Sequence, residues 1–185
     1  MDLDTQGVRY VAATNPVTGL LNQIEEDENA PLFNLRRLPM DKVFEAAPEF
    51  SSLIGVWDGK RRGGEALPDW SRFDFVDFRG WHSDIVISCF PDAEPDPLFR
   101  ISGENFNGLV NSNIAGARFS TYWPRLFGIQ FRDHFQTIRD TGNIGLVEGR
   151  LAAQSRGFLT VQVIELPCRD GGDGVGRLIH GIRVS

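Results

Sequence analysis

Three strand-like segments fill the last third of the chain, and only short turns join them. They are IGLVEGRL (144–151), GFLTVQVIELP (157–167) and GRLIHGIRV (176–184). A parallel link between neighbouring strands needs a crossover of about a dozen residues or more, for which these turns are too short. The three segments are therefore expected to pair antiparallel, and this expectation constrains the fold more than any other feature of the sequence.

An earlier hairpin adds two strands to the same sheet. Its strands are DIVISCF (84–90) and LFRIS (98–102), and the proline-rich turn PDAEPDP (91–97) separates them. Helical segments lie between this hairpin and the three closing strands. The sequence therefore predicts an α+β domain with a five-stranded antiparallel sheet that carries helices on one face.

The N-terminal part of the chain divides into two segments before the core begins. Residues 1–47 are expected to be an extension with a packing or tethering role, with a short strand at 8–12 and a helix after Pro16. Residues 48–83 hold a lead-in helix and an extended segment, and residues 84–185 hold the core.

One apolar stripe is clear in the lead-in helix. It follows the i, i+3, i+4, i+7 spacing and consists of Phe50, Leu53, Ile54 and Trp57. Because the strand at 157–167 is mixed on both of its faces, the sheet face away from the other helices also needs a cover. The stripe can supply it, either from the same chain or from a second subunit. We expect a homodimer through this helix and the sheet.

The charge balance is acidic, with 25 Asp and Glu against 19 Lys and Arg and a net charge of −6. Nucleic acids and anionic membranes are bound by concentrated basic surface, so neither is expected as a partner. Cys89 and Cys168 belong to no CxxC pair, so no metal cluster or disulfide framework is expected. No stretch has the pattern of a signal peptide or a membrane span, and we expect a reducing, cytoplasmic location.

Three passages are informative when taken together. They are the lead-in that ends in LPDWSRFDF (67–75), the passage FRISGENFNGLVNSNIAGARF (99–119) and the closing hairpin VQVIELPCRDGGDGVGRLIHGIRV (161–184). Their order and spacing resemble a PAS domain, and more narrowly the stand-alone PAS-domain family common in proteobacteria. Gly103 and Gly116 match its turns, whereas Asn111 stands where the family usually has glycine. This resemblance implies a sensory or protein-interaction module whose sheet cups a cavity beneath the short helices.

The helix RLFGIQFRDHFQTIRD (125–140) is expected to turn a histidine into that cavity. At 100° per residue, one arc contains Phe127, Phe131, His134, Phe135 and Ile138. A small apolar molecule is the expected ligand. The candidate ligand-binding residues are Phe106, Trp123, Phe127, Phe131, His134 and Phe135.

Several roles for His134 stay open. Haem-binding PAS domains take their axial histidine from the corresponding helix, so the resemblance makes His134 a candidate haem ligand. A core histidine that only forms hydrogen bonds, or one that orients an organic ligand, fits the same position. Flavin photochemistry is disfavoured, because neither Cys89 nor Cys168 lies in the Asn-Cys-Arg-Phe context of the light-sensing PAS domains.

Catalysis requires several reactive side chains in a fixed mutual arrangement. The sequence offers few candidates for such a set. Asp133 and His134 point apart on a helix, and no serine sits in a nucleophile elbow. A small isomerase or dehydratase is the alternative, and it requires His134 within hydrogen-bond reach of a buried carboxylate, beside an open pocket. We expect a module without catalytic activity of its own, acting through a separate signalling protein or through self-association.

Overall fold

The computed structural model describes residues 32–153 and 157–185. Its strands are β1 (Asn34–Leu38), β2 (Ile85–Cys89), β3 (Leu98–Ser102), β4 (Ile144–Ala153), β5 (Gly157–Arg169) and β6 (Val175–Val184). Its α-helices are α2 (Met40–Ala46), α3 (Ser51–Gly59), α4 (Glu104–Val110), α5 (Phe119–Tyr122), α6 (Pro124–Leu126) and α7 (Arg132–Thr141). Short 3₁₀ turns lie at Pro48–Phe50, Trp70–Arg72 and Phe75–Phe78, and a π turn at Phe127–Phe131 joins α6 to α7.

The six strands form one antiparallel sheet in the order β1-β4-β5-β6-β2-β3. The fold class is the predicted one, α+β with one antiparallel sheet that carries helices, and β2 to β6 are the five predicted strands. The strand count differs by one, because β1 pairs with β4 at the edge of the sheet. Two adjacent arginines interrupt the alternation of its sequence, NLRRL, so the pattern does not reveal this strand. The strand expected at 8–12 and the helix expected after Pro16 lie outside the described residues.

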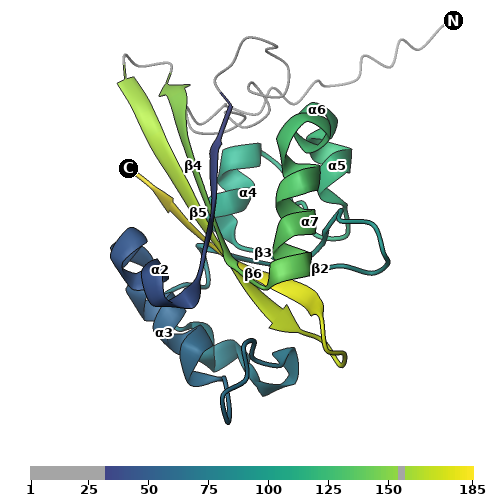
Figure 1. Cartoon of the computed structure of the whole chain (residues 1–185). Coiled ribbons are helices and arrows are strands. Elements are labelled where there is room, and N and C mark those ends of the chain that lie inside the picture. The colour runs from purple at the N-terminus through teal and green to yellow at the C-terminus, as the bar shows by residue number, and fades with distance from the viewer. Residues whose placement is uncertain (1–31, 154–156) are drawn as a thin grey trace, which may run out of the picture.

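Helices lie on both faces of the sheet (Figure 1). The helices α4 to α7 lie on one side of the sheet, and α2 and α3 lie on the other. The α3 stripe is buried as predicted, and an added Cβ at Gly181 of β6 would lie 2.4 Å from the Leu53 side chain. Trp57 Nε1 donates a 2.8 Å hydrogen bond to the Pro167 carbonyl of β5. The cover that the second face of the sheet needs therefore comes from the same chain.

The turns around the short helix α4 fall where the sequence predicts them. Gly103 precedes the helix, and an added Cβ there would lie 2.5 Å from the Ser83 carbonyl oxygen, so a larger residue does not fit. Asn111 follows it with a φ of 52°, a left-handed conformation in which asparagine is enriched. Gly116 makes the next turn with a φ of 90°. Together these turns keep the helix short and fold the middle of the chain back over the sheet.

The helix predicted for 125–140 is interrupted in its first half. It begins at Pro124 as α6, passes through the π turn at Phe127–Phe131 and continues as α7, which Gly142 ends with a φ of 68°. A π turn holds more residues than an α turn, so it rotates the residues before it relative to α7. All members of the predicted arc are nevertheless buried, namely Phe127, Phe131, His134, Phe135 and Ile138.

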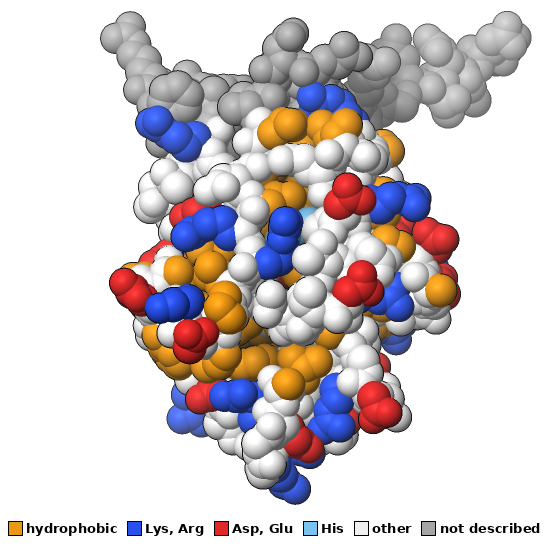
Figure 2. Space-filling model, in the orientation of Figure 1, with side chains coloured by type: hydrophobic (Ala, Val, Ile, Leu, Met, Phe, Trp, Pro, Cys, Tyr) orange, Lys and Arg blue, Asp and Glu red, His pale blue; other side chains and the backbone are white. Residues whose placement is uncertain are grey.

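Both signs of charge occur on the surface (Figure 2). On the face shown, Lys and Arg side chains lie among Asp and Glu side chains, and apolar side chains gather in a band across its lower half. Opposite charges placed in this way form local ion pairs, such as Arg118 Nη2 with Asp92 Oδ2 at 2.6 Å. In the part of the chain that the structure describes, no helix is both long and apolar enough to span a membrane.

Candidate ligand cavity

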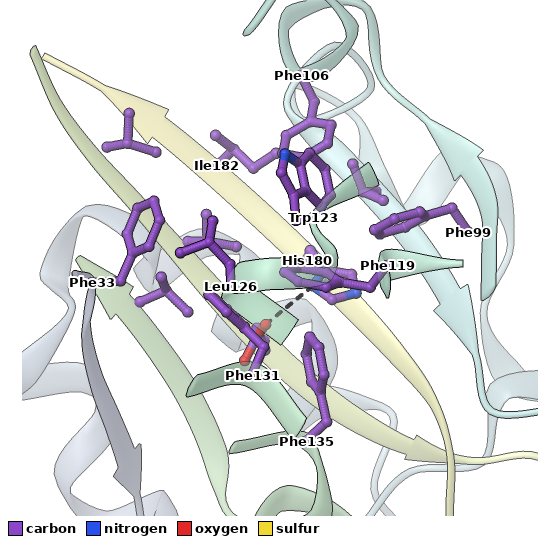
Figure 3. Close-up of a pocket in the computed structure, with 15 residues that line it drawn as sticks. Phe33, Phe99, Phe106, Phe119, Trp123, Leu126, Phe131, Phe135, His180 and Ile182 are labelled. Carbon is purple, nitrogen blue, oxygen red and sulfur yellow. Dashed lines mark ion pairs between the residues drawn. The ribbon is translucent and has the colours of Figure 1, made fainter. Parts of the chain in front are cut away.

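A cavity of about 70 Å³ lies between the sheet and the helices α4 to α7. Aromatic side chains dominate the helical wall, and aliphatic side chains dominate the sheet wall (Figure 3). The lining residues are Phe33, Val86, Phe99, Phe106, Phe119, Trp123, Leu126, Phe131, Phe135, Val147, Val161, Val163, Glu165, His180 and Ile182. Walls of this composition suit a molecule with little polar surface.

The rings of the helical wall form one connected cluster. The centroid of Phe119 lies 4.6 Å from that of Phe131 and 4.9 Å from that of Trp123. Trp123 in turn meets Phe106 of α4 edge to face, at 6.1 Å between centroids. Such pairs have preferred mutual orientations, so a change in one ring affects its neighbours. A molecule in the cavity would therefore contact a connected set of side chains from several helices.

Phe33, which precedes β1, supplies part of the cavity wall from the N-terminal segment. Its ring meets Phe131 edge to face, at 5.9 Å between centroids. The Gln130 side chain in the π turn binds its backbone twice, accepting from the Phe33 N–H at 3.2 Å and donating to the Phe33 carbonyl at 2.8 Å. Gly149 of β4 leaves room for the ring, since an added Cβ would lie 2.4 Å from Phe33 Cδ1. Three separate features thus hold this ring against the cavity.

Trp123 brings an unusual polar group to the helical wall. Its side chain is buried, and its indole Nε1 has no hydrogen-bond partner among the described residues. A buried N–H without an acceptor costs free energy comparable to a lost hydrogen bond, so such groups are rare. Figure 3 shows the nitrogen edge of the ring turned toward Ile182, which lines the opposite wall.

A chain of polar contacts runs from β1 to β2, and all of its members except the exposed Arg37 are buried. His134 Nε2 lies 2.5 Å from Glu165 Oε2, and Glu165 Oε1 lies 3.6 Å from His180 Nδ1. At the two ends, His180 Nε2 is 2.8 Å from Ser88 Oγ, and His134 Nδ1 is 3.4 Å from Arg37 Nη1. Both ring nitrogens of each histidine therefore already face a polar neighbour.

The buried carboxyl of Glu165 is held in its ionised form. Burial by itself raises the pKa of this group, but the charge of His134 and hydrogen bonds from His134 and His180 outweigh burial and lower the pKa from 4.5 to about 2. Gly145 of β4 leaves room for the carboxylate, since an added Cβ would lie 2.2 Å from Glu165 Oε2. The two imidazoles thus satisfy a buried charge, which is a stabilising role that needs no ligand.

The structure brings together four of the six predicted ligand-binding residues. The four that line the cavity are Phe106, Trp123, Phe131 and Phe135. Phe127 instead borders an outer groove beside α7, and His134 faces Glu165. The π turn accounts for the position of Phe127, because the prediction assumed 100° for every residue of the helix.

Several residues that line the cavity were not among the predicted ones, and the sequence holds more evidence for some of them than for others. Glu165 alternates with valines on β5, and His180 alternates with Ile182 on β6, so strand periodicity places them on one face. Phe33 has no comparable pattern, because it is a single aromatic residue in a segment without periodicity. Phe119 lies on a helix of only four residues, too short for a helical pattern to develop.

Haem does not fit the described residues. His134 Nε2 faces Glu165 and its Nδ1 faces Arg37, so no ring nitrogen of His134 is turned to the cavity. An apolar cavity of about 150 Å³ accepts one benzene molecule, and the cavity of about 70 Å³ is smaller than that. A porphyrin or a three-ring flavin is much larger than benzene and requires a different cavity. Among the described residues, no three His, Cys, Asp or Glu side chains converge on a possible metal site.

The isomerase or dehydratase alternative meets only one of its two requirements. His134 does lie within hydrogen-bond reach of a buried carboxylate, that of Glu165. The open pocket is not found at His134 among the described residues, because His134 is outside the set that lines the cavity. A general base must reach the proton that it abstracts, directly or through one water, so this position of His134 does not favour the alternative.

Comparison with known proteins adds little to this geometry. No family model and no curated protein matches the sequence. A solved structure of an RNA-binding light-oxygen-voltage receptor has a similar fold over 66% of this chain and 35% of that chain, at 12% identity and a TM-score of 0.45. This chain thus spans about a third of the length of that receptor chain. A similarity of this size supports no inference about ligand, partner or activity.

Proposed function

We propose that this protein is a sensory or regulatory module of the stand-alone PAS type, which binds a small apolar molecule and has no catalytic activity of its own. The supporting observation is the cavity of about 70 Å³ between the two layers of the fold, walled almost wholly by apolar side chains. Globular interiors are close-packed, so a cavity that remains among rings is a natural binding site for a small apolar molecule.

The signal is proposed to be a population shift. A molecule in the cavity contacts the helical wall through Phe106, Trp123 and Phe135, and it contacts the sheet through Val161 and Val163. It therefore favours whichever arrangement of helices and sheet gives it the better contacts. The far face of the sheet carries α3 through Gly181 and Leu53, so a shift of the sheet also reaches that surface.

Output is proposed to go through a separate signalling protein or through a homodimer in the cytoplasm. The apolar stripe of α3 already packs on its own sheet, so a homodimer through this helix has to use the remaining surface of the lead-in segment. Phe75 and Val76 belong to this segment, and each is 63% exposed. Sedimentation velocity on the wild type and on Phe75→Ser tests the homodimer, and a wild-type monomer at all concentrations would reject it.

Xenon tests whether the cavity binds an apolar guest, because it is small, apolar and visible by ¹²⁹Xe NMR. The wild type is expected to give a saturable xenon shift. Val161→Phe extends a larger side chain into the cavity and should abolish the saturable shift, whereas Val76→Phe, at an exposed position, should preserve it. No saturable xenon binding to the wild type would reject the cavity as a ligand site.

The same titration tests the population shift. Amide resonances in α5 to α7 are expected to move on xenon saturation, and so are those of β6 and α3 on the far side of the sheet. Shifts that stay confined to the residues around the cavity would leave a binding site but reject the transmission through the sheet.

A further inference from the structure

Trp123 differs from the other tryptophans whose indole hydrogen bonds the structure defines. Trp57 Nε1 donates to the Pro167 carbonyl at 2.8 Å, and Trp81 Nε1 donates to Ser52 Oγ at 3.1 Å. Trp123 is buried to a similar degree, with 3% of its surface exposed, but its Nε1 donates to no described residue. The fold therefore supplies an acceptor for the first two indoles and leaves Trp123 Nε1 unpaired at the cavity wall.

The surroundings of Trp123 offer only a poor substitute for an acceptor. Phe99 and Phe106 both meet its ring edge to face, at 6.1 Å between centroids. An N–H that points at an aromatic face gains less than one that meets an oxygen atom. A buried water is no better, because it needs two to four polar partners, and the polar atoms of the lining residues Glu165 and His180 already face His134, each other or Ser88.

We propose that the cavity selects a small neutral molecule with an apolar body and one hydrogen-bond acceptor, such as a short ketone, aldehyde or ether, whose oxygen accepts from Trp123 Nε1. This inference rests on the function proposed above and adds the chemical class of the ligand. The acceptor requirement follows from the unpaired donor, and the apolar body follows from the surrounding rings.

Charge excludes two other classes of ligand. An anion would lose its hydration among the phenylalanine rings, and the Glu165 side chain that lines the cavity carries a charge of the same sign. A cation would compete with His134 and His180 for that carboxylate and would lose its hydration among phenylalanine rings. A neutral ligand with a hydrogen-bond acceptor is not repelled by the carboxylate, and it has no ionic hydration to lose.

Acetone and isobutene are a matched pair of probes, because they have the same shape and differ by a C=O in place of a C=CH₂. Their affinities are measured by NMR titration for the wild type and for Trp123→Phe, which keeps an aromatic ring and removes the donor. The ratio of the two dissociation constants cancels the different hydration of the probes when the proteins are compared. Loss of the donor is expected to shift this ratio about fivefold against acetone, the value of one net hydrogen bond.

Two further measurements test the acceptor requirement without relying on Trp123→Phe alone. Phe106→Leu alters the same wall without touching a donor, so it should change both affinities and leave their ratio near the wild-type value. In wild-type protein, the indole N–H resonance of Trp123 should move downfield on acetone binding and should not do so on isobutene binding.

The outcomes separate this inference from the proposed function. Saturable xenon binding with an unchanged acetone-to-isobutene ratio in Trp123→Phe overturns the acceptor requirement and leaves the apolar ligand site in place. A Trp123 N–H resonance that does not respond to acetone has the same consequence. If xenon, acetone and isobutene all fail to bind the wild type, the proposed function itself is rejected.

Discussion

His134 Nε2 and Glu165 Oε2 lie 2.5 Å apart, and both side chains are buried between α7 and the sheet. Each residue comes from a different layer of the fold, so this contact joins the helix to β5 through the Glu165 carboxylate. Replacement of one partner leaves the other polar group buried without its partner, which is far more costly than the loss of a surface pair.

Glu165→Ala is therefore expected to lower the free energy of unfolding by about 3–5 kcal/mol. The matched control is Glu148→Ala, which breaks the Arg36–Glu148 ion pair at 3.0 Å on the edge of the same sheet. That pair is partly exposed, so its loss should cost less than about 1 kcal/mol. Urea denaturation measures both, and equal costs for the two variants would contradict a structural role for the buried pair.

The acid stability of the protein should depend on the same carboxylate. Its pKa is depressed from 4.5 to about 2 in the folded state, so the folded state is favoured above the unfolded-state pKa and loses this advantage as the pH falls toward 2. This contribution amounts to about 3 kcal/mol. The stability advantage of the wild type over Glu165→Gln, which cannot titrate, should be present at pH 5 and shrink progressively below it. An advantage that does not change between pH 5 and pH 3 would argue against the depressed pKa.

Gly181 tests the contact between α3 and the sheet. An added Cβ would lie 2.4 Å from Leu53 Cδ2, so Gly181→Ala should destabilise the protein by about 1–3 kcal/mol through overpacking. Leu53→Ala in the same chain should partly relieve this clash, so the two costs should not add. Gly55→Ala is the control, because no atom lies within 4 Å of its added Cβ, and an alanine in a helix should stabilise by up to about 1 kcal/mol. Additive costs for Gly181→Ala and Leu53→Ala would show that α3 does not pack there.

The elements that the sequence predicts well are those in which periodicity and turn chemistry agree. The closing strands β4 to β6 are each ten or more residues long, and short turns force them to be antiparallel. The stripe from Phe50 to Trp57 repeats over two helical turns, and Asn111 and Gly116 mark left-handed turns by residue type alone. In each case a local physical rule acts on consecutive residues.

The candidate site was harder to predict because its decisive contacts are long-range. The burial of His134 follows from the helical arc, but its partner Glu165 is 31 residues away on another element. Phe33 and Gln130 are 97 residues apart, and only the pairing of β1 with β4 brings them together. The π turn that removes Phe127 from the cavity has no recognised sequence pattern. The sequence does not reveal the positions of side chains that depend on tertiary packing rather than on local spacing.

Phe33 is expected to control the size of the cavity and access to it. Its ring is 8% exposed and lines the cavity, and among the described residues the two Gln130 hydrogen bonds and the contact with Phe131 hold it on the helical side. Phe33→Ala should enlarge the cavity, cost about 3 kcal/mol in the free energy of unfolding, and speed the exchange of bound xenon. Phe44→Ala, at a ring of α2 that is 42% exposed and does not line the cavity, should cost less free energy of unfolding and leave xenon exchange at the wild-type rate. Urea denaturation and ¹²⁹Xe exchange NMR measure the two effects separately. If Phe33→Ala destabilises the protein but xenon exchanges at the wild-type rate, guests enter elsewhere and this ring serves only as core.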